Sequence, residues 1–355
     1  QRKARTMTTP GSYALPYNGE APPPMQMMEM LYGALATQMI SVAAELGVAD
    51  QLADGPRPVS ELATAVGAHE VNLFRLLRGL AGLGVFEEVS PRVFGLNPLG
   101  ETLRSGVKGS MKEIAQDVGG RTRLVAYSEL AHSVRTGEVA FEKAHGTSMW
   151  NYLQSHPEEV ALFGKAMGNL ASEAHSVAFS NYDLSDAKYL IDIAGGEGWL
   201  IAAVAPHYPN LKATVFDEEH VVHAAEQVFA RVGIADRANG VAGDMFESVP
   251  AGGDVYVVSS ILFSYDDPEA GKVLSNIREA MDPKGRILIL EPVLPDGNGP
   301  HPGKLLDVTQ LALHRGGIRT VPEWEALFAA SGLKLAETRV MWPAGPTDMI
   351  IAEAA

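Results

Sequence analysis

The second half of the chain alternates between apolar runs of strand length and longer segments that carry apolar residues on one helical face. Strands are predicted at about 188–193, 212–217, 238–242, 254–260 and 286–291. Helices are predicted between them, near 198–206, 219–232 and 267–282. A helix over 321–331 and an antiparallel pair at 334–340 and 349–352 follow. This order is typical of an α/β protein with an open, mostly parallel sheet.

The first half of the chain has a different, mostly helical pattern. Apolar residues recur three or four positions apart from Met25 to Leu52 and again over 71–83. Between them, Ser60 is expected to cap a short helix over 61–66. Residues 85–96 are predicted to form a two-stranded wing. Helix, helix and wing together predict a winged-helix domain.

A winged helix can bind DNA, but the charges oppose that use here. From Ser60 to Arg104 the chain has four arginines and five glutamates, so this stretch has no excess of positive charge with which to displace counterions from a duplex. The formal net charge of −15 opposes nucleic acid as a general partner. Dimer contact is the better hypothesis for the winged helix. The methionine-rich start of the first helix, Met25 to Met30, suits either a contact surface or a plain core helix.

Composition narrows the class of protein further. With 355 residues, 46% of them hydrophobic, the chain is long enough for two domains with real cores. It has no cysteine, which excludes disulfides, thiolate zinc sites and thiol nucleophiles. Residues 1–24 are polar and rich in Pro and Gly, which predicts a flexible tail. The longest apolar stretch contains Glu29 and Glu45 and falls short of a membrane span, so we expect a cytoplasmic protein.

A glycine cluster joins the first predicted strand of the sheet to the helix after it. Gly195, Gly196 and Gly198 permit unusual backbone angles and let the backbone approach a ligand closely. The N–H groups at the start of the helix point to the same place. Asp217, 19 residues past Gly198 and at the end of the next strand, suits a bidentate hydrogen bond to ribose hydroxyls. The unit is therefore predicted to bind a nucleoside, although such a turn can also be purely structural.

The details of this turn favour one class of nucleoside. A dinucleotide fingerprint needs glycine where Ala194 stands. Asp192, at the end of the strand, resembles instead the acid in the first motif of class I S-adenosylmethionine (SAM) methyltransferases. Ligands of such sheets bind beyond the carboxyl ends of the strands. The polar residues expected at that edge are Asp192, Asp217, Asp244, Ser259 and Ser260.

Several sequence blocks, in order from about Pro24 to the end, carry a resemblance to one family. They are MWNYLQSHPEEVALFGKAM, IDIAGGEG, TVFDEEHVV, AGDMFESVPAGGDVYVVSSILFSYDDPEA, ILILEPVLPDG and GGIRTVPEWEALFAASGL. The chain resembles the small-molecule O-methyltransferases related to plant caffeate and flavonoid enzymes and to bacterial enzymes that tailor secondary metabolites. The resemblance implies a Rossmann-like SAM-binding sheet over 184–355, a helical substrate-pocket segment over 106–183, and a winged-helix domain over 25–105 that forms a homodimer.

The resemblance also assigns roles to single residues. Gly195, Gly196 and Gly198 would hold the methionine part of SAM, Asp217 the ribose, and Asp244 with Met245 the adenine. Ser259 stands where a lysine near the cofactor is common. Aromatic and methionine residues expected at the substrate pocket, each with a plain core role as the alternative, are Trp150, Phe163, Met167, Phe263 and Tyr265.

The chain departs from the family at the expected catalytic residues. Members that deprotonate a phenol use a histidine in a block like LHDWDD, supported by two glutamates. Here Phe263 takes the place of the histidine and Ile318 that of one glutamate, while Glu291 remains. Glu291 and His314, as a replacement base, are the catalytic candidates. A metal held by His314, Asp307 seven residues before it and Glu291 is a weaker hypothesis, so no metal is expected.

Loss of the histidine does not exclude methyl transfer. A general base contributes ~10²–10⁴-fold, whereas alignment of the reactants supplies about 7–11 kcal/mol. We therefore predict a SAM-dependent methyltransferase that acts on a small aromatic or enolic secondary metabolite. One alternative is a SAM-binding enzyme that catalyses a non-methylating step such as decarboxylation, hydroxylation or cyclisation. A second is a winged-helix regulatory binder.

Overall fold

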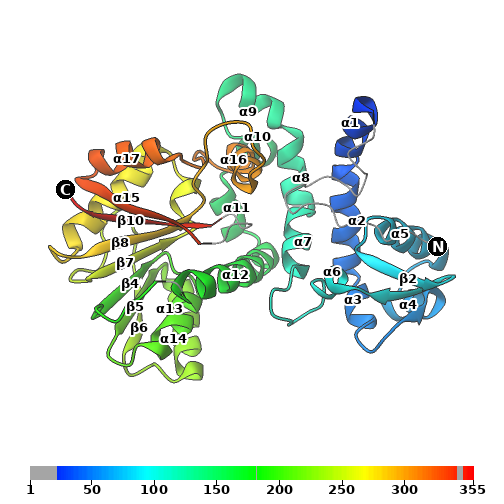
Figure 1. The fold of residues 1–355 in the computed structure, drawn as a ribbon, viewed down its shortest axis with the longest axis horizontal. Helices are drawn as coiled ribbons and strands as arrows, with labels where there is room; N and C mark the ends of the chain where they lie inside the picture. Colours follow the sequence, from blue (N-terminus) through cyan, green and yellow to red (C-terminus); the bar gives the residue numbers. More distant parts are fainter. Residues whose placement is uncertain (1–21, 181, 342–346) are drawn as a thin grey trace, which may run out of the picture. The chain divides into compact units, whose positions relative to one another are not determined.

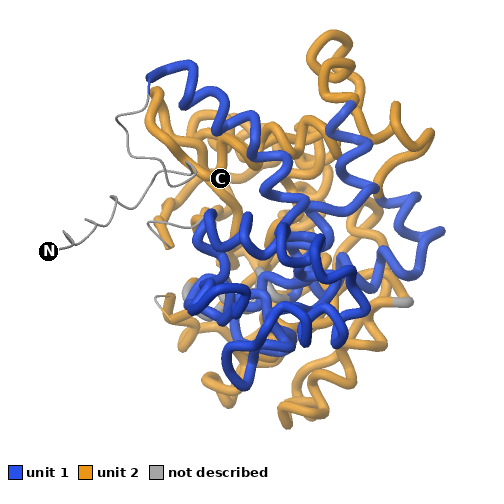
Figure 2. The backbone as a smooth tube through the Cα atoms, turned by 90° about the vertical axis from the view of Figure 1, so that its right-hand side faces the viewer, with its two compact units in different colours: residues 1–128, 150–170 blue, residues 129–149, 171–355 orange. Residues whose placement is uncertain are grey.

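The chain folds into two units, each with its own core. The computed structural model describes residues 22–180, 182–341 and 347–355, without the side chains of 169–174, 176, 177 and 220. One unit comprises residues 1–128 and 150–170, and the other residues 129–149 and 171–355 (Figure 2). The predicted tail lies almost wholly outside the described residues. The segment predicted to line the substrate pocket, 106–183, is divided between the two units.

The first unit contains the predicted wing. Strands β2 (Phe86–Ser90) and β3 (Val93–Leu96) pair antiparallel, and the two-residue strand β1 (Arg57–Pro58) adds to β3 on its other side. Helices α4 (Val59–Val66) and α5 (Glu70–Gly82) pack with this sheet around a core that includes Leu62, Leu77 and Phe94 (Figure 1). Further helices of the unit are α6 (Pro98–Glu101), α7 (Lys112–Val118), α8 (Arg121–Ser128), α11 (Met149–Gln154) and the first part of α12 (Pro157–Ser180).

Two details of the predicted helices were wrong. The helical pattern from Met25 to Leu52 forms three helices, α1 (Pro23–Leu31), α2 (Gly33–Glu45) and α3 (Val48–Gln51), and Gly47 breaks the last two apart with φ +67°. Ser60 does not cap α4, which begins at Val59. The Val59 N–H donates to Arg92 O at 2.9 Å and its side chain is buried, so tertiary contacts fix the first turn.

The second unit contains a seven-stranded sheet in the order β6-β5-β4-β7-β8-β10-β9 (Figure 1). Its strands are β4 (Tyr189–Ile193), β5 (Lys212–Asp217), β6 (Ala238–Ala242), β7 (Val255–Ser259), β8 (Arg286–Glu291), β9 (Leu333–Val340) and β10 (Asp348–Ala354). The first five are parallel, and β10 runs antiparallel to β8 and β9. Every predicted strand is confirmed to within two residues, and so is the Rossmann-like fold class.

Helices cover both faces of this sheet, and the strand residues alternate between two cores. Leu190 faces the core shared with α13 (Trp199–Val204), α14 (Glu219–Val232) and the end of α12. Ile191 and Ile193 face the core shared with α15 (Asp267–Ala280) and α17 (Val321–Ala330). The remaining helices of the unit are α9 (Leu130–Thr136), α10 (Ala140–His145), α16 (Pro302–Leu313) and the 3₁₀ turns η1 (Ala205–His207) and η2 (Leu262–Ser264). In the part of the chain that is described, no helix is both long and apolar enough to cross a bilayer.

A row of apolar side chains on α1 and α2 remains uncovered in the single chain. Met30 and Leu31 are 69% and 66% exposed, and the other members are Met25, Met27, Met28, Tyr32, Leu35 and Val42. We call this row the α1–α2 apolar surface. Many exposed apolar side chains on two consecutive helices indicate an interface, in agreement with the expected homodimer.

Substitution Leu31→Glu should weaken the dimer about tenfold or more, because a carboxylate in a desolvated contact costs free energy. Multi-angle light scattering over a dilution series measures the change. Val71→Glu is the matched control, since Val71 is an exposed valine on α5 outside the α1–α2 apolar surface. A Leu31→Glu variant that stays as dimeric as the control would contradict this assignment.

Candidate functional site

The turn between β4 and α13 follows a path that side chains would block. A Cβ on Gly195 would collide with the Asp192 carboxyl group, and it would lie 2.7 Å from Val215 Cγ2. Gly198 has φ +75°, and a Cβ there would lie 2.7 Å from the Phe229 ring. Gly196 has φ +60°, a conformation that glycine adopts without strain. The turn therefore passes close over the carboxyl edge of the sheet, as the glycine spacing predicts.

Asp217 ties this turn to the end of β5. Its Oδ2 accepts a hydrogen bond from Gly196 N–H at 2.8 Å, and its Oδ1 accepts one from Glu218 N–H at 2.7 Å. The carboxylate is only partly buried and lies at the strand end where a ribose contact was expected. Its role toward ribose stays a prediction.

Asp192 lies beneath the turn and is completely buried. Neither carboxylate oxygen has a hydrogen-bond partner among the described residues. Burial, and then the charge of Asp217, raises the pKa of Asp192 well above its usual range. A buried carboxyl group without donors is costly. The amino acid end of SAM carries an ammonium group that would supply both donors and charge, so the residues present fit this cofactor.

The other predicted cofactor residues lie at the same edge of the sheet. The turn after β6 is held beside β5, because Gly243 N–H donates to Asp217 O at 3.0 Å. Asp244 Oδ1 accepts from Phe246 N–H at 2.8 Å, and Met245 O accepts from Asn276 Nδ2 at 2.8 Å. These bonds hold Asp244 and Met245, the two residues predicted to flank the adenine, in the turn after β6.

Ser259 and Ser260 stand at the end of β7, next to β4. Ser259 Oγ lies 2.8 Å from His175 Nε2. Ser260 has φ +58°, and its N–H donates to Leu290 O at 3.1 Å. The structure thus brings the predicted polar residues of four neighbouring strands to one edge. It adds His175 of α12 through the bond to Ser259.

Glu291 holds the turn that follows β7. Its Oε1 accepts hydrogen bonds from the N–H groups of Ile261, Leu262 and Phe263, at 3.0, 2.5 and 3.3 Å. Burial raises the pKa of Glu291 to about 7, although Arg319 and these three amides act in the opposite direction. These contacts show Glu291 as the anchor of the turn that carries Phe263, and a catalytic role for it stays a prediction.

Arg319 binds the same turn from its carbonyl side. Its guanidinium donates to Leu262 O at 3.1 Å, to Tyr265 O at 3.0 Å and to Asp267 Oδ1 at 3.0 Å. Sequence reasoning missed Arg319, because its partners lie more than fifty residues earlier and no local pattern links them. Together the buried acid and the buried arginine fix both ends of the Phe263 turn.

His314 lies two residues before a glycine that packs against this turn, and it is not on a helix. Helix α16 ends at Leu313, and His314 is extended with φ −139° and ψ 177°. His314 and Asp307 therefore do not share one helical face, and Asp307 Oδ1 accepts from Ile318 N–H at 2.8 Å. Two residues on, a Cβ at Gly316 would collide with Phe263 O. Within the described residues, no group of three or more His, Asp or Glu could hold a metal ion.

The five predicted pocket residues fall in the two units. In the first, the Trp150 and Phe163 rings meet edge to face at 5.9 Å, and Met167 lies one turn after Phe163 on α12. In the second, Phe263 lies on the anchored turn, and Tyr265 packs edge-on against Phe246 at 5.1 Å. Burial raises the pKa of Tyr265 to about 12, so its hydroxyl stays neutral. That these residues share one pocket stays a prediction.

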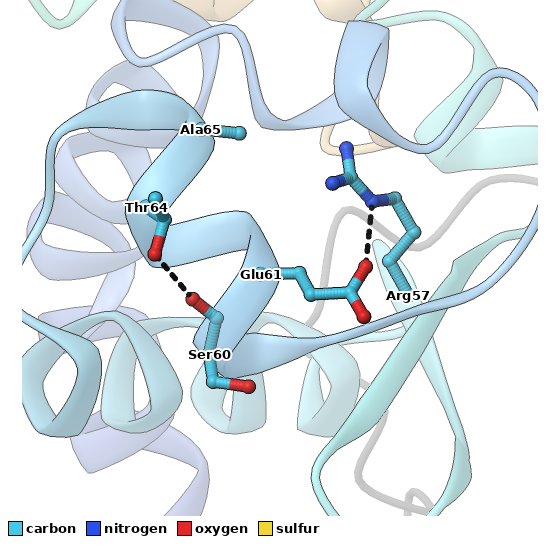
Figure 3. Close-up of a pocket in the computed structure, with 5 residues that line it drawn as sticks. All are labelled: Arg57, Ser60, Glu61, Thr64 and Ala65. Atoms are coloured by element: carbon cyan, nitrogen blue, oxygen red, sulfur yellow. Dashed lines mark hydrogen bonds and ion pairs between the residues drawn. The ribbon is translucent and has the colours of Figure 1, made fainter.

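Two surface hollows have other linings. One, of about 430 Å³, lies on the winged helix, where Arg57 Nε is 3.5 Å from Glu61 Oε2 and Thr64 Oγ1 donates to Ser60 O (Figure 3). The other, of about 710 Å³, lies at the amino edge of the sheet beside Lys188, Lys212 and Arg237. Neither is lined by a residue predicted for the site.

Substitution Asp217→Ala should weaken binding of S-adenosylhomocysteine about tenfold or more, because it removes the predicted ribose acceptors and the bond to Gly196. Isothermal titration calorimetry measures the dissociation constant. Asp236→Ala is the matched control, an exposed aspartate near the amino edge of the same sheet, and should bind like the wild type. Equal affinities for the two variants would remove Asp217 from the site.

The raised pKa of Glu291 predicts a pH dependence of stability. The folded state prefers the protonated acid, so this group adds stability below its ordinary pKa of 4.5, and that stability is lost as the pH rises to about 7. Glu291→Gln keeps an oxygen for the three amides and cannot ionise. Relative to wild type, its free energy of unfolding in urea should rise by about 3 kcal/mol from about pH 4 to about pH 8. Parallel pH profiles would contradict the shift.

Comparisons with known proteins identify the family. Residues 127–334 match the O-methyltransferase domain, and residues 28–106 match the O-methyltransferase dimerisation domain. The chain is 41% identical over 317 residues to the phenazine O-methyltransferase PhzM of Lysobacter antibioticus, covering 89% of this chain and 93% of the relative. The match to the dimerisation domain supports the expected homodimer.

Solved structures agree with this assignment. The crystal structure of LaPhzM matches with a TM-score of 0.89 and 39% identity, covering 94% of this chain and all of that one. The O-methyltransferase NcsB1 from neocarzinostatin biosynthesis, solved with SAM and 2-hydroxy-5-methyl naphthoic acid, matches with a TM-score of 0.77 and 32% identity, covering 90% and 96%. Methyl transfer from SAM in secondary metabolism is thereby confirmed, and the non-methylating and regulatory alternatives are not favoured. The chain belongs to the family of SAM-dependent O-methyltransferases.

Proposed function

We propose that this enzyme methylates a hydroxyl group on a small, fused aromatic metabolite, and that residue 263 takes no part in removing the proton. The observation that carries the proposal is the anchored turn after β7. Its backbone is held by Glu291 and Arg319, yet it presents the phenyl ring of Phe263, which cannot accept a proton. The substrates named for the relatives, a phenazine and a naphthoic acid, support an acceptor of this size.

Binding of the cofactor rests on three groups at the sheet edge: the glycine turn, Asp192 beneath it and Asp217 beside it. SAM supplies a methyl group on a positively charged sulfur, which leaves as a neutral thioether. The chain's own task is then to hold the acceptor oxygen in line, which can supply about 7–11 kcal/mol. Phe263 and Tyr265, on and beside the anchored turn, are the proposed walls of the acceptor pocket within the second unit.

His314 is the proposed proton acceptor. It lies two residues before Gly316, whose backbone packs directly against that of Phe263 and Tyr265. The hydroxyl proton would pass to the imidazole while the acceptor oxygen bonds to the methyl carbon. Glu291 would act only through the turn that it holds. The reaction consumes SAM, a cytoplasmic metabolite, and this supports a cytoplasmic location as part of the same proposal.

Substitution His314→Gln should lower kcat about 10²-fold toward a weakly acidic phenol and much less toward a phenol that is already ionised, because only the first needs a base. The assay is mass-spectrometric detection of S-adenosylhomocysteine formed with hydroxyphenazine and hydroxynaphthoate acceptors. His223→Gln, at an exposed histidine on α14, is the control. Equal losses for both phenols would remove His314 as the base, and no methylated product from any hydroxylated acceptor would contradict the function.

Substitution Phe263→His places a base on the anchored turn. It should therefore raise kcat toward the weakly acidic phenol several-fold. The same assay measures it. An unchanged rate would mean that the acceptor oxygen does not lie near residue 263.

A further inference from the structure

His175 is a buried histidine that no part of the mechanism above uses. It lies near the end of α12, in the second unit, and is 6% exposed. Its Nε2 lies 2.8 Å from Ser259 Oγ, whereas its Nδ1 has no hydrogen-bond partner among the described residues. Buried polar atoms are seldom left unpaired, so this nitrogen needs an explanation.

The sheet register places this histidine at the cofactor edge. Val255 and Val257 of β7 face the core shared with α13 and α14, so Ser259, two residues on, faces the same side. Asp192 of β4 is level with Val257 and faces that side too. Ser259 is therefore level with Ala194, at the start of the glycine turn. It lies two residues further than Asp192 toward the carboxyl edge of the sheet. His175 reaches the same place through its bond to Ser259.

Buried polar atoms at this place lack hydrogen-bond donors from the part of the chain that the structure describes. Burial lowers the pKa of His175 to about 4, so the ring is neutral near pH 7, with one N–H donor and one acceptor. In the tautomer that donates Nε2–H to Ser259 Oγ, Nδ1 presents its lone pair. The two oxygens of Asp192 also lack donors within the described residues. Three atoms without a partner within the described residues, His175 Nδ1 and the two Asp192 oxygens, thus lie on one face of the sheet, beside the turn expected to hold the methionine end of SAM.

A primary ammonium group carries three N–H donors, which matches this set. We propose that His175 Nδ1, together with the Asp192 carboxylate, binds the α-ammonium group of the methionine end of SAM. Ser259 fixes the ring so that Nδ1 faces the ligand. His175 is thus a cofactor-binding residue beyond the glycine turn and Asp217. This inference rests on SAM binding at the carboxyl edge, as the proposed function does.

The test compares two ligands and two variants of the full chain by calorimetry. S-adenosylhomocysteine carries the ammonium group, and 5′-methylthioadenosine lacks the whole amino acid end. Asparagine places a polar atom near the position of Nδ1, whereas glutamine places one near Nε2. His175→Gln should lose about tenfold in affinity for S-adenosylhomocysteine and less than about twofold for 5′-methylthioadenosine. His175→Asn should stay within about threefold of wild type for both.

Two outcomes would overturn the inference. One is unchanged binding of S-adenosylhomocysteine by His175→Gln, and the other is an equal loss for both ligands, which would indicate a structural role. Failure of the wild type to bind either ligand would instead count against the proposed function. If the variants do not fold, the ¹⁵N resonance of His175 Nδ1 in the wild-type protein tests the inference instead. It should shift toward a hydrogen-bonded value with S-adenosylhomocysteine but not with 5′-methylthioadenosine, and no difference between the two would also overturn the inference.

Discussion

The site depends on close contact between a backbone turn and a buried carboxyl group. Gly195 passes so near Asp192 that any side chain at 195 would collide with it. The next residue, Gly196, donates its N–H to Asp217, which joins the ends of β4 and β5. The turn is thereby held over a buried acid whose oxygens lack donors among the described residues. This arrangement is suited to a ligand with a cationic end and a diol, and SAM has both.

The turn after β7 shows how the chain retains the family's scaffold with different chemistry. Glu291 binds its amides and Arg319 its carbonyls, so the backbone path is fixed without help from the side chain at 263. A phenyl ring can therefore replace the expected histidine without loss of the turn. In the proposed mechanism the tasks are separate, because Glu291 holds the turn and His314 accepts the proton.

Most of the sheet and its cofactor edge could be predicted from the sequence, because strand periodicity and the glycine spacing are local signals. Features that depend on contacts between residues far apart in the sequence could not be predicted. Helix α4 begins one residue before Ser60 because Val59 bonds to the wing, and α16 ends at Leu313, directly before His314. The roles of Glu291, Arg319 and His175 depend on partners from 28 to 84 residues away. No sequence pattern gives such pairs.

The most direct test of the account is a crystal structure of the full chain with S-adenosylhomocysteine. The account predicts that the ribose hydroxyls lie within hydrogen-bond distance of the Asp217 carboxylate, that the amino acid end lies over Asp192 under the glycine turn, and that the adenine lies beside Asp244 and Met245. Density for the ligand at any other edge of the sheet, or no bound ligand at saturating concentration, would contradict it.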